Sequence, residues 1–348
     1  MNLLVKHYSG SISYGTNLPT SDTDFRGIYC DPPREVVTPW TPPRSEQWKD
    51  PTEEDTVLTE LHKYMIGYVN GSPNVLETLW VDDRFITETS EAYEYLRSRR
   101  SELISKKLRY TYGGYALGQL KRMKGHYKWI NNPQPEEPPV RSNYFSLVFN
   151  YTSDKIFNRD FNIHQYNEDH SFVPCGGNIF GIIENPGHSL FNDDGSIHRV
   201  DYSQIDDNIK KSFPKFIVKL NEDVYLADKD NHSNYWKWKR ERNEKRSELE
   251  AKFGLDVKHL MHLVRLMRMC EEVLTDGEIK VFRPDAEELL AIRNGSWTYD
   301  DAIKWSKDQD AKLNTLMKKS DLPESVDLSK ASEILIKTEE IANGVVQR

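Results

Sequence analysis

Residues 10–16 read GSISYGT and residues 21–29 read SDTDFRGIY, and these two stretches decide the fold. The apolar-rich run at residues 3–8 predicts a strand that ends at the first glycine of the earlier stretch. The later stretch predicts a second strand, and residues 56–61 predict a third. Prolines crowd residues 31–51, which are therefore expected to form a loop.

The second predicted strand has an acidic face. Side chains alternate along a strand, so Asp22, Asp24 and Arg26 are expected to project to one side. Two carboxylates so close repel each other unless a cation lies between them or one takes up a proton. Oxygen ligands of this kind suit Mg²⁺, which proteins commonly hold with carboxylates and substrate phosphates. Gly10 lets the backbone approach a ligand, and the following amides with the Ser11 hydroxyl can receive phosphate oxygens.

The remaining apolar patterns are mostly helical. Helices are predicted at residues 64–80, 90–129 (interrupted at Gly113-Gly114), 236–253, 257–267, 285–292 and 299–318. Residues 133–139 are rich in proline and glutamate and predict a linker, while residues 141–228 show no clear period. We therefore expect three parts: a domain of strands and helices in residues 1–130 that carries the acidic residues and is the expected catalytic domain, an irregular insertion or linker in residues 131–232, and a C-terminal helical domain in residues 233–348 that closes a cleft over the catalytic domain.

The composition limits the class of protein. Hydrophobic residues make up 37% of the 348 residues and charged residues 29%, and no stretch approaches the ~20 apolar residues of a membrane helix. The first residues lack the apolar core of a signal peptide. The three cysteines form no Cys-x-x-Cys pair, so a reducing, cytoplasmic location is the simplest. The net charge of −8 argues against a dedicated DNA coat but allows local basic contacts with nucleic acid.

The glycine stretch and the Asp-x-Asp stretch together resemble the signature of the DNA polymerase β nucleotidyltransferase superfamily, Gly-[Gly/Ser] followed by Asp-x-[Asp/Glu]. The longer runs around them are similar to one branch, the predicted nucleotidyltransferases associated with RNA repair. Two later blocks, residues 242–266 and 283–295, agree with that branch. The resemblance covers roughly residues 3–130 and 233–305. It implies an α+β fold with a small mixed-sheet nucleotidyltransferase core, flanking helices and a C-terminal helical domain.

The resemblance also implies a third carboxylate on an adjacent strand. Glu60, inside the predicted strand at residues 56–61, is the first candidate and Asp55 the second; otherwise Glu60 is an exposed strand residue. With Asp22 and Asp24, three carboxylates would hold two Mg²⁺ ions, or Mn²⁺, at roughly 4 Å separation. One ion would activate an acceptor hydroxyl and the other would steady the triphosphate and its leaving pyrophosphate. Glu60 or one aspartate would accept the proton of the hydroxyl.

The second block places several polar residues on one predicted helix. In one interpretation Lys258, His262 and Arg265 point into the cleft, with the lysine and the arginine as cations for the triphosphate. The predicted nucleotide-binding residues are then Gly10, Ser11, Arg26, Lys258, His262 and Arg265. In the other interpretation the helix belongs to the core, and its charged residues pair with Glu250, Asp256 and Glu271. His259 and His262 could meet on one helix face, but no further ligands are evident, so zinc is not expected.

Two segments interleave basic and aromatic residues, at 110–129 and at 235–240. Cations contact phosphates and rings stack on unpaired bases, so both segments could guide the end of an RNA or DNA strand. Otherwise they are solvated helix faces whose rings pack inward.

We therefore expect an enzyme that moves a nucleoside monophosphate from a nucleoside triphosphate to an acceptor hydroxyl and releases pyrophosphate. The resemblance favours the 3′ end of an RNA, such as tRNA, as the acceptor; a protein hydroxyl and a small molecule are alternatives. A non-catalytic nucleic-acid-binding module on the same fold is a further alternative, against which the intact Asp22 and Asp24 argue. P-loop and serine-hydrolase motifs do not occur in the sequence.

Overall fold

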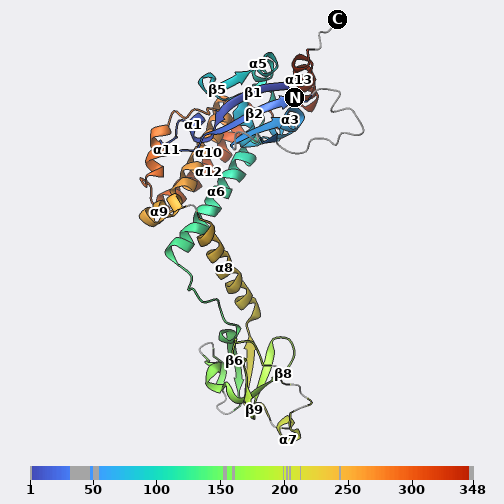
Figure 1. Cartoon of the computed structure of the whole chain (residues 1–348), viewed down its shortest axis with the longest axis vertical. Helices are drawn as coiled ribbons and strands as arrows, with labels where there is room; N and C mark the ends of the chain where they lie inside the picture. The colour runs from blue at the N-terminus through green and yellow to red at the C-terminus, as the bar shows by residue number, and fades with distance from the viewer. Residues whose placement is uncertain are drawn as a thin grey trace. The chain divides into compact units, whose positions relative to one another are not determined.

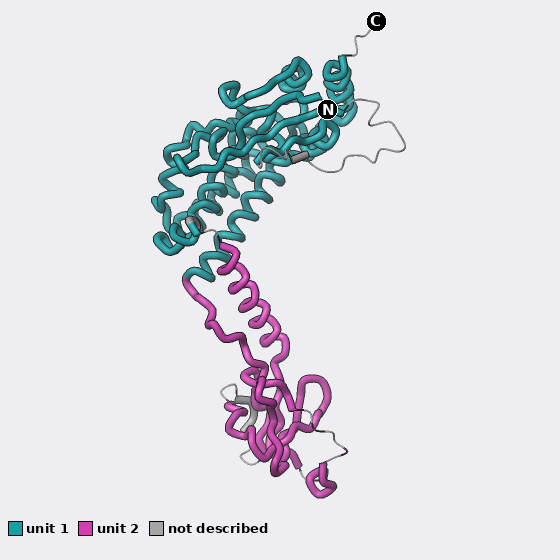
Figure 2. Tube along the Cα trace, viewed as in Figure 1, with its two compact units in different colours: residues 1–130, 244–348 teal, residues 131–243 magenta. Residues whose placement is uncertain are grey.

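The computed structural model describes residues 2–31, 48–49, 55–151, 155–158, 161–198, 200, 203, 205–211, 213–242 and 244–344. The chain forms two compact units, drawn in teal and magenta in Figure 2. Unit 1 comprises Met1–Ile130 and Glu244–Arg348, and unit 2 comprises Asn131–Asn243. The two outer parts expected from the sequence thus form one unit. The boundary expected at residue 232 moves to residue 243, because the helix containing it continues to Glu241.

A five-stranded mixed sheet forms the centre of unit 1, in the order β3-β4-β2-β1-β5. The strands are β1 (Asn2–Ser9), β2 (Asp24–Cys30), β3 (Trp48–Lys49), β4 (Thr56–Glu60) and β5 (Ile86–Thr89). β2 and β4 are parallel, whereas the other neighbouring pairs are antiparallel. The strands predicted at residues 3–8, 21–29 and 56–61 are confirmed as β1, β2 and β4. Of the predicted proline-rich loop, residues 32–47 and 50–51 lie outside the described residues.

Helices make up most of the rest of unit 1 (Figure 1). They are α1 (Gly10–Tyr14), α3 (Leu61–Val69), α4 (Pro73–Leu76), α5 (Glu91–Ser98), α6 (Leu108–Asn131), α9 (Glu244–Phe253), α10 (Val257–Asp276), α11 (Ala286–Arg293), α12 (Tyr299–Lys319) and α13 (Leu328–Ala342), with 3-10 turns η1 (Glu77–Leu79), η2 (Asp83–Phe85) and η3 (Arg100–Leu103). Unit 1 is therefore an α+β fold with a small mixed sheet, as the sequence predicted. None of the described helices combines the length and the apolar character needed to cross a bilayer.

One hydrophobic core joins the sheet of unit 1 to its helices. Leu4 of β1 and Ile28 of β2 belong to the same buried cluster as Leu260 and Val264 of α10. The apolar stripe predicted at three- and four-residue steps along α10 is buried throughout. α10 follows unit 2 in the chain, so the two sequence segments of unit 1 share one core.

α6 runs without a break through Gly113-Gly114, where the sequence predicted an interruption. A Cβ at Gly113 would lie 2.2 Å from a guanidinium nitrogen of Arg109, so glycine makes room for this buried side chain. Arg109 in turn binds the Asp310 carboxylate at 2.6 Å. Tertiary packing of α6 therefore outweighs the low helix propensity of its glycines.

Unit 2 contains a second five-stranded sheet, in the order β7-β6-β10-β9-β8, so the expectation of an irregular insertion is wrong. Its elements are η4 (Arg141–Tyr144), β6 (Phe145–Asn150), β7 (Lys155–Asn158), η5 (Ile163–Tyr166), β8 (Glu168–Pro174), β9 (Ile179–Ser189), α7 (Asp207–Lys210), β10 (Phe216–Leu220) and α8 (Glu222–Glu241). Its pairs are antiparallel, and Phe145, Phe172 and Phe191 form the centre of its core. The register shifts between β6 and β10 and between β8 and β9 leave extra residues in β6 and β9, which interrupt the alternation that would reveal these two strands in the sequence.

Gly27 is required by the close approach of neighbouring strands. A Cβ there would lie 2.2 Å from the Val5 carbonyl oxygen and 2.7 Å from the Leu58 side chain. We predict that Gly27→Ala lowers the free energy of unfolding by about 1–3 kcal/mol. Gly118→Ala is the matched control, because a Cβ at this exposed position in α6 meets nothing within 4 Å. Alanine favours a helix more than glycine does, so this variant should raise the free energy of unfolding by about 0.5–1 kcal/mol.

Urea unfolding of both variants measures these opposite effects. A Gly27→Ala variant that is as stable as the original protein would contradict the tight packing of β2 against β1 and β4.

Candidate active site

The glycine turn and the second aspartate of the Asp-x-Asp pair lie against each other. β1 and β2 pair antiparallel with Ser9 opposite Asp24, so the turn that starts at Gly10 lies next to this carboxylate. A Cβ at Gly10 would lie 2.8 Å from Oδ2 of Asp24, and the residue has a φ of 64°. Both the space and the backbone conformation therefore require glycine.

Asp55 joins Asp24 at the same end of the sheet. β2 and β4 are parallel with Phe25 opposite Thr56, and the Phe25 amide donates to the Asp55 carbonyl at 3.0 Å. Each aspartate directly precedes one of these paired residues. Neighbouring side chains in a parallel pair lie on the same face, so the two carboxylates are placed on one face at one end of the sheet.

The Asp24 carboxyl lies among both negative and positive side chains, which act on its pKa. Burial raises the pKa of the Asp24 carboxyl, and the negative charges of Asp55 and Asp22 raise it further. The nearby cations Arg26 and Lys258 lower the same pKa, but the net shift is upward. Asp22, which precedes β2, Arg26 within β2 and Lys258 of α10 therefore all act on the Asp24 carboxyl through their charges.

Glu60, the first candidate for the third carboxylate, lies elsewhere. It pairs with Tyr29 at the opposite end of β2 and β4, five residues beyond Asp55, which is roughly 16 Å along a strand. It also belongs to the other face of the sheet, because its position alternates with that of Asp55. Glu60 is therefore separated from Asp24 in position and in face, whereas Asp55, the second candidate, lies beside Asp24.

Glu60 instead begins a helix. Its carboxylate accepts hydrogen bonds from the amides of His62 at 2.8 Å and Lys63 at 3.2 Å, and from the His62 ring at 3.0 Å. Burial raises the pKa of Glu60, but these hydrogen bonds outweigh burial and hold the pKa below its usual value. Glu60 is thus the N-cap of α3.

The three predicted residues of α10 are placed differently from one another. Lys258 is exposed, and its charge acts on Asp24. His262 is half-buried one turn further along the helix. Arg265 is buried: its guanidinium donates to Glu77 at 3.0 Å and lies 3.7 Å from the centre of the Tyr14 ring. Burial against these partners contradicts the predicted contact between Arg265 and a triphosphate.

Arg265 helps to anchor α1, the short helix that begins at Gly10. Tyr14, at the end of α1, donates its hydroxyl proton to the Glu77 carboxylate at 2.6 Å, which completes a buried group of arginine, glutamate and tyrosine. Burial holds the pKa of Tyr14 far above its usual value, so the hydroxyl stays a donor. Sequence reasoning did not find this role for Glu77, because 188 residues separate it from Arg265.

The third sequence block also anchors α1. The amide of Arg283 donates to the Tyr14 carbonyl at 3.1 Å. Its buried guanidinium binds Glu272 at 2.7 and 2.8 Å and Asp285 at 2.8 Å. The short helix that begins at the glycine turn is therefore held by two buried arginines whose charges are already balanced.

Comparison with known proteins supports the resemblance. Residues 1–145 match the model of a family described as the RNA repair pathway DNA polymerase beta family, which confirms the predicted branch for this part of the chain and suggests polymerase-β-type nucleotidyl transfer. A protein of Enterobacteria phage T4, named "Uncharacterized 38.9 kDa protein in nrdC-mobD intergenic region", is 25% identical over 131 residues. The match covers 35% of this chain and 39% of the length of the phage protein. No solved structure matches the chain.

The pKa of Asp24 should depend on Asp55 and not on Glu60. We predict that Asp55→Asn brings the pKa of Asp24 down toward its usual value, because a repelling charge is removed. Glu60→Gln, the matched control from the other end of β4, should leave that pKa unchanged. NMR titration of the carboxyl carbons without divalent cations measures both. The reverse result would show that Glu60, and not Asp55, is the neighbour of Asp24.

The buried pair of Arg265 and Glu77 should be strongly coupled. Glu77→Ala leaves a buried guanidinium without its carboxylate, so we predict a loss of about 3–5 kcal/mol in the free energy of unfolding. The double variant Glu77→Leu with Arg265→Met should lose less than the sum of its single variants. Urea unfolding of the two single variants and the double variant measures this coupling. A loss below about 1 kcal/mol for Glu77→Ala would mean that the ion pair contributes no more than one on the protein surface.

Proposed function

We propose that Asp22, Asp24 and Asp55 bind divalent cations, and that the protein transfers a nucleoside monophosphate from a nucleoside triphosphate to an acceptor hydroxyl. The observation that carries this proposal is that Asp24 and Asp55 lie at one end of the sheet, with Asp24 directly against the turn at Gly10. The family match over residues 1–145 supports the same class of reaction.

The donor set fits Mg²⁺. Carboxylate oxygens are the protein ligands that this ion prefers, and it leaves other positions to water and phosphate oxygens. Burial raises the pKa of Asp24, and the charges of Asp55 and Asp22 raise it further, whereas Arg26 and Lys258 lower it; the net shift is upward, so the carboxylate gains from a bound cation. Bound Mg²⁺ would supply charge neutralisation for the phosphates and acidify the acceptor hydroxyl. Mn²⁺ offers the same chemistry to the same oxygens.

The chain's own residues have separate roles in this proposal. The turn at Gly10 and Ser11 lets the backbone approach the triphosphate, because no side chain stands between it and Asp24. Arg26 and Lys258 add positive charge beside the phosphates, and His262 lies one turn from the lysine. The hydroxyl oxygen bonds to the α-phosphorus, the bond to pyrophosphate breaks, and the hydroxyl proton passes to a carboxylate of the site.

An RNA end is the acceptor that we favour. The matching family is described by RNA repair, and α6 presents exposed aromatic and basic side chains: Tyr110, Tyr115, Lys121, Arg122 and Lys124. Rings and cations in this arrangement suit an unpaired strand. The other basic segment is less available, because Trp236 donates to the Pro135 carbonyl at 2.9 Å and Arg242 lies 4.1 Å from the Trp238 ring centre.

Substitution of the carboxylates tests the proposal. Asp24→Asn and Asp55→Asn should each lower transfer of label from an α-labelled nucleoside triphosphate by roughly 100-fold or more, because each removes a metal-binding oxygen at the reacting phosphate. Glu60→Gln is the control and should keep its activity. Retained transfer in Asp55→Asn together with lost transfer in Glu60→Gln would refute the assignment.

The same assay identifies the acceptor when RNA, protein and small-molecule fractions are offered separately. Label in the RNA fraction supports the favoured acceptor, and label in protein or a small molecule assigns one of the alternatives. Label in no fraction, with triphosphate binding that neither Mg²⁺ nor Asp24→Ala alters, would assign a non-catalytic binding module.

A further inference from the structure

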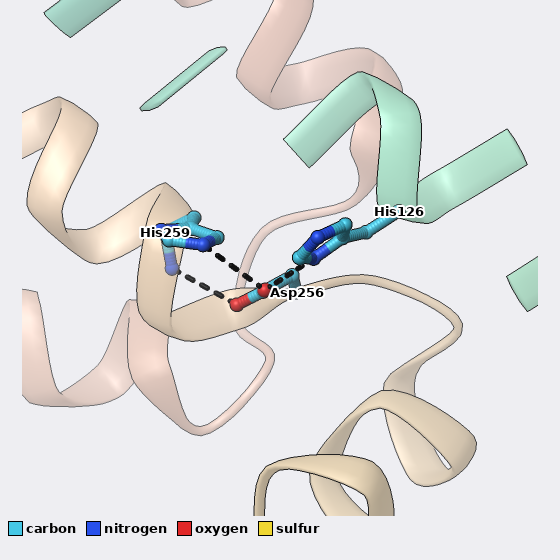
Figure 3. A group of neighbouring side chains, drawn as sticks. All are labelled: His126, Asp256 and His259. Atoms are coloured by element: carbon cyan, nitrogen blue, oxygen red, sulfur yellow. Dashed lines mark hydrogen bonds and ion pairs between the residues drawn. The ribbon is translucent and has the colours of Figure 1, made fainter. Parts of the chain in front are cut away.

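Two histidines and an aspartate that are far apart in the sequence meet between α6 and the start of α10 (Figure 3). His126 comes from α6, Asp256 is the N-cap of α10, and His259 lies in the first turn of α10. One ligand atom from each lies within 4.8 Å of the others. Asp256 is fully buried, His259 is 7% exposed and the His126 side chain is 16% exposed, so the group is largely shielded from water.

The donor atoms converge on one carboxylate oxygen. Oδ2 of Asp256 lies 2.8 Å from Nδ1 of His126 and 3.6 Å from Nε2 of His259. A second carboxylate is close, with Oε1 of the buried Glu250 3.8 Å from Nδ1 of His126. Figure 3 shows both rings directed at the carboxylate between them.

The ring of His259 is also oriented from outside the group. Its Nδ1 lies 2.7 Å from Oε1 of the buried Gln119, so a proton on Nδ1 is donated to the amide oxygen. Nε2 then presents its lone pair toward Asp256. An outer hydrogen bond that fixes tautomer and ring orientation is the usual support for a histidine that ligates a metal.

We propose that His126, Asp256 and His259 bind one Zn²⁺ ion, with Glu250 as the fourth ligand. Imidazole and carboxylate donors suit this ion, and tetrahedral bonds of about 2.1 Å place ligand atoms about 3.3 Å apart. The separations of 2.8, 3.6 and 3.8 Å lie on both sides of this value. The sequence prediction that zinc is absent here considered only His259 and His262, which lack the other ligands.

The site differs in chemistry from the all-carboxylate site and does not rest on the proposed function. Zn²⁺ would join α6 to the first turn of α10, where Lys258 lies between two of the ligands in the sequence. The ion would thus stabilise the fold and fix the helix turn that carries the lysine near Asp24.

The test uses the full chain, freed of metal with a chelator and then titrated with Zn²⁺ in the presence of excess Mg²⁺. We expect one Zn²⁺ per chain and a rise of roughly 5 °C in the thermal unfolding midpoint. His126→Asn removes the imidazole but keeps an N–H donor near the position of Nδ1, so the hydrogen bond to Asp256 can survive. This variant should bind Zn²⁺ at least ~100-fold more weakly. His188→Asn, an exposed histidine of unit 2, is the matched control and should bind like the original chain.

Co²⁺ in place of Zn²⁺ gives a second readout, since a tetrahedral site produces intense visible absorption that His126→Asn should abolish. If His126→Asn does not fold, His259→Gln replaces it in both measurements. The proposal would be overturned if the original chain did not bind Zn²⁺, or if all variants bound it equally. The three side chains would then form a hydrogen-bonded group without a metal. Loss of nucleotidyl transfer in the aspartate variants has no bearing on this result, because they keep His126 and His259.

Discussion

Negative charge is concentrated at one end of the unit 1 sheet, and the rest of the unit is arranged around this constraint. Strand pairing sets it: the antiparallel pair β1–β2 places Asp24 at the glycine turn, and the parallel pair β2–β4 places Asp55 beside it. The carboxylates cannot move apart without breaking main-chain hydrogen bonds such as that from Phe25 to Asp55. Burial raises the pKa of Asp24, and the negative charges of Asp55 and Asp22 add to this rise. A divalent cation relieves the repulsion between carboxylates, and carboxyl groups with perturbed pKa values cluster at functional sites for reasons of this kind.

The positive charges behind this site are balanced by other partners. Arg265 is neutralised by Glu77, and Arg283 by Glu272 and Asp285, so these buried arginines hold α1 in place without offsetting the aspartates. The main cationic influences on the Asp24 carboxyl, Arg26 and Lys258, are more exposed to solvent. The buried arginines therefore anchor the helix at the turn through their own carboxylate partners, and the aspartates at the end of the sheet are not among those partners.

Local patterns in the sequence were sufficient for the strands β1, β2 and β4 and for the Asp22–Asp24 pair, because alternation and turn residues act over a few positions. They were insufficient for the third carboxylate. Glu60 and Asp55 flank the same short strand, and the choice between them depends on the direction and register of β4 against β2, which are long-range properties. The burial of Arg265 could not be predicted from local patterns either, because its partner Glu77 lies 188 residues away in the sequence. The sheet of unit 2 was missed for two reasons. Register shifts disturb the alternation of polar and apolar residues, and the paired strands β6 and β10 lie far apart in the sequence.

α10 shows why the two segments of unit 1 depend on each other. The chain leaves unit 1 after Ile130 and returns at Glu244, so this helix comes from the segment beyond the family match. Successive side chains of a helix point about 100° apart, so the residues of one helical turn can face two different parts of the protein. Lys258 acts on the aspartates of the N-terminal segment, while Asp256 and His259 meet His126 of α6. The backbone that carries Lys258 is therefore the same turn that carries Asp256 and His259, so the two segments of unit 1 meet at this turn in two ways.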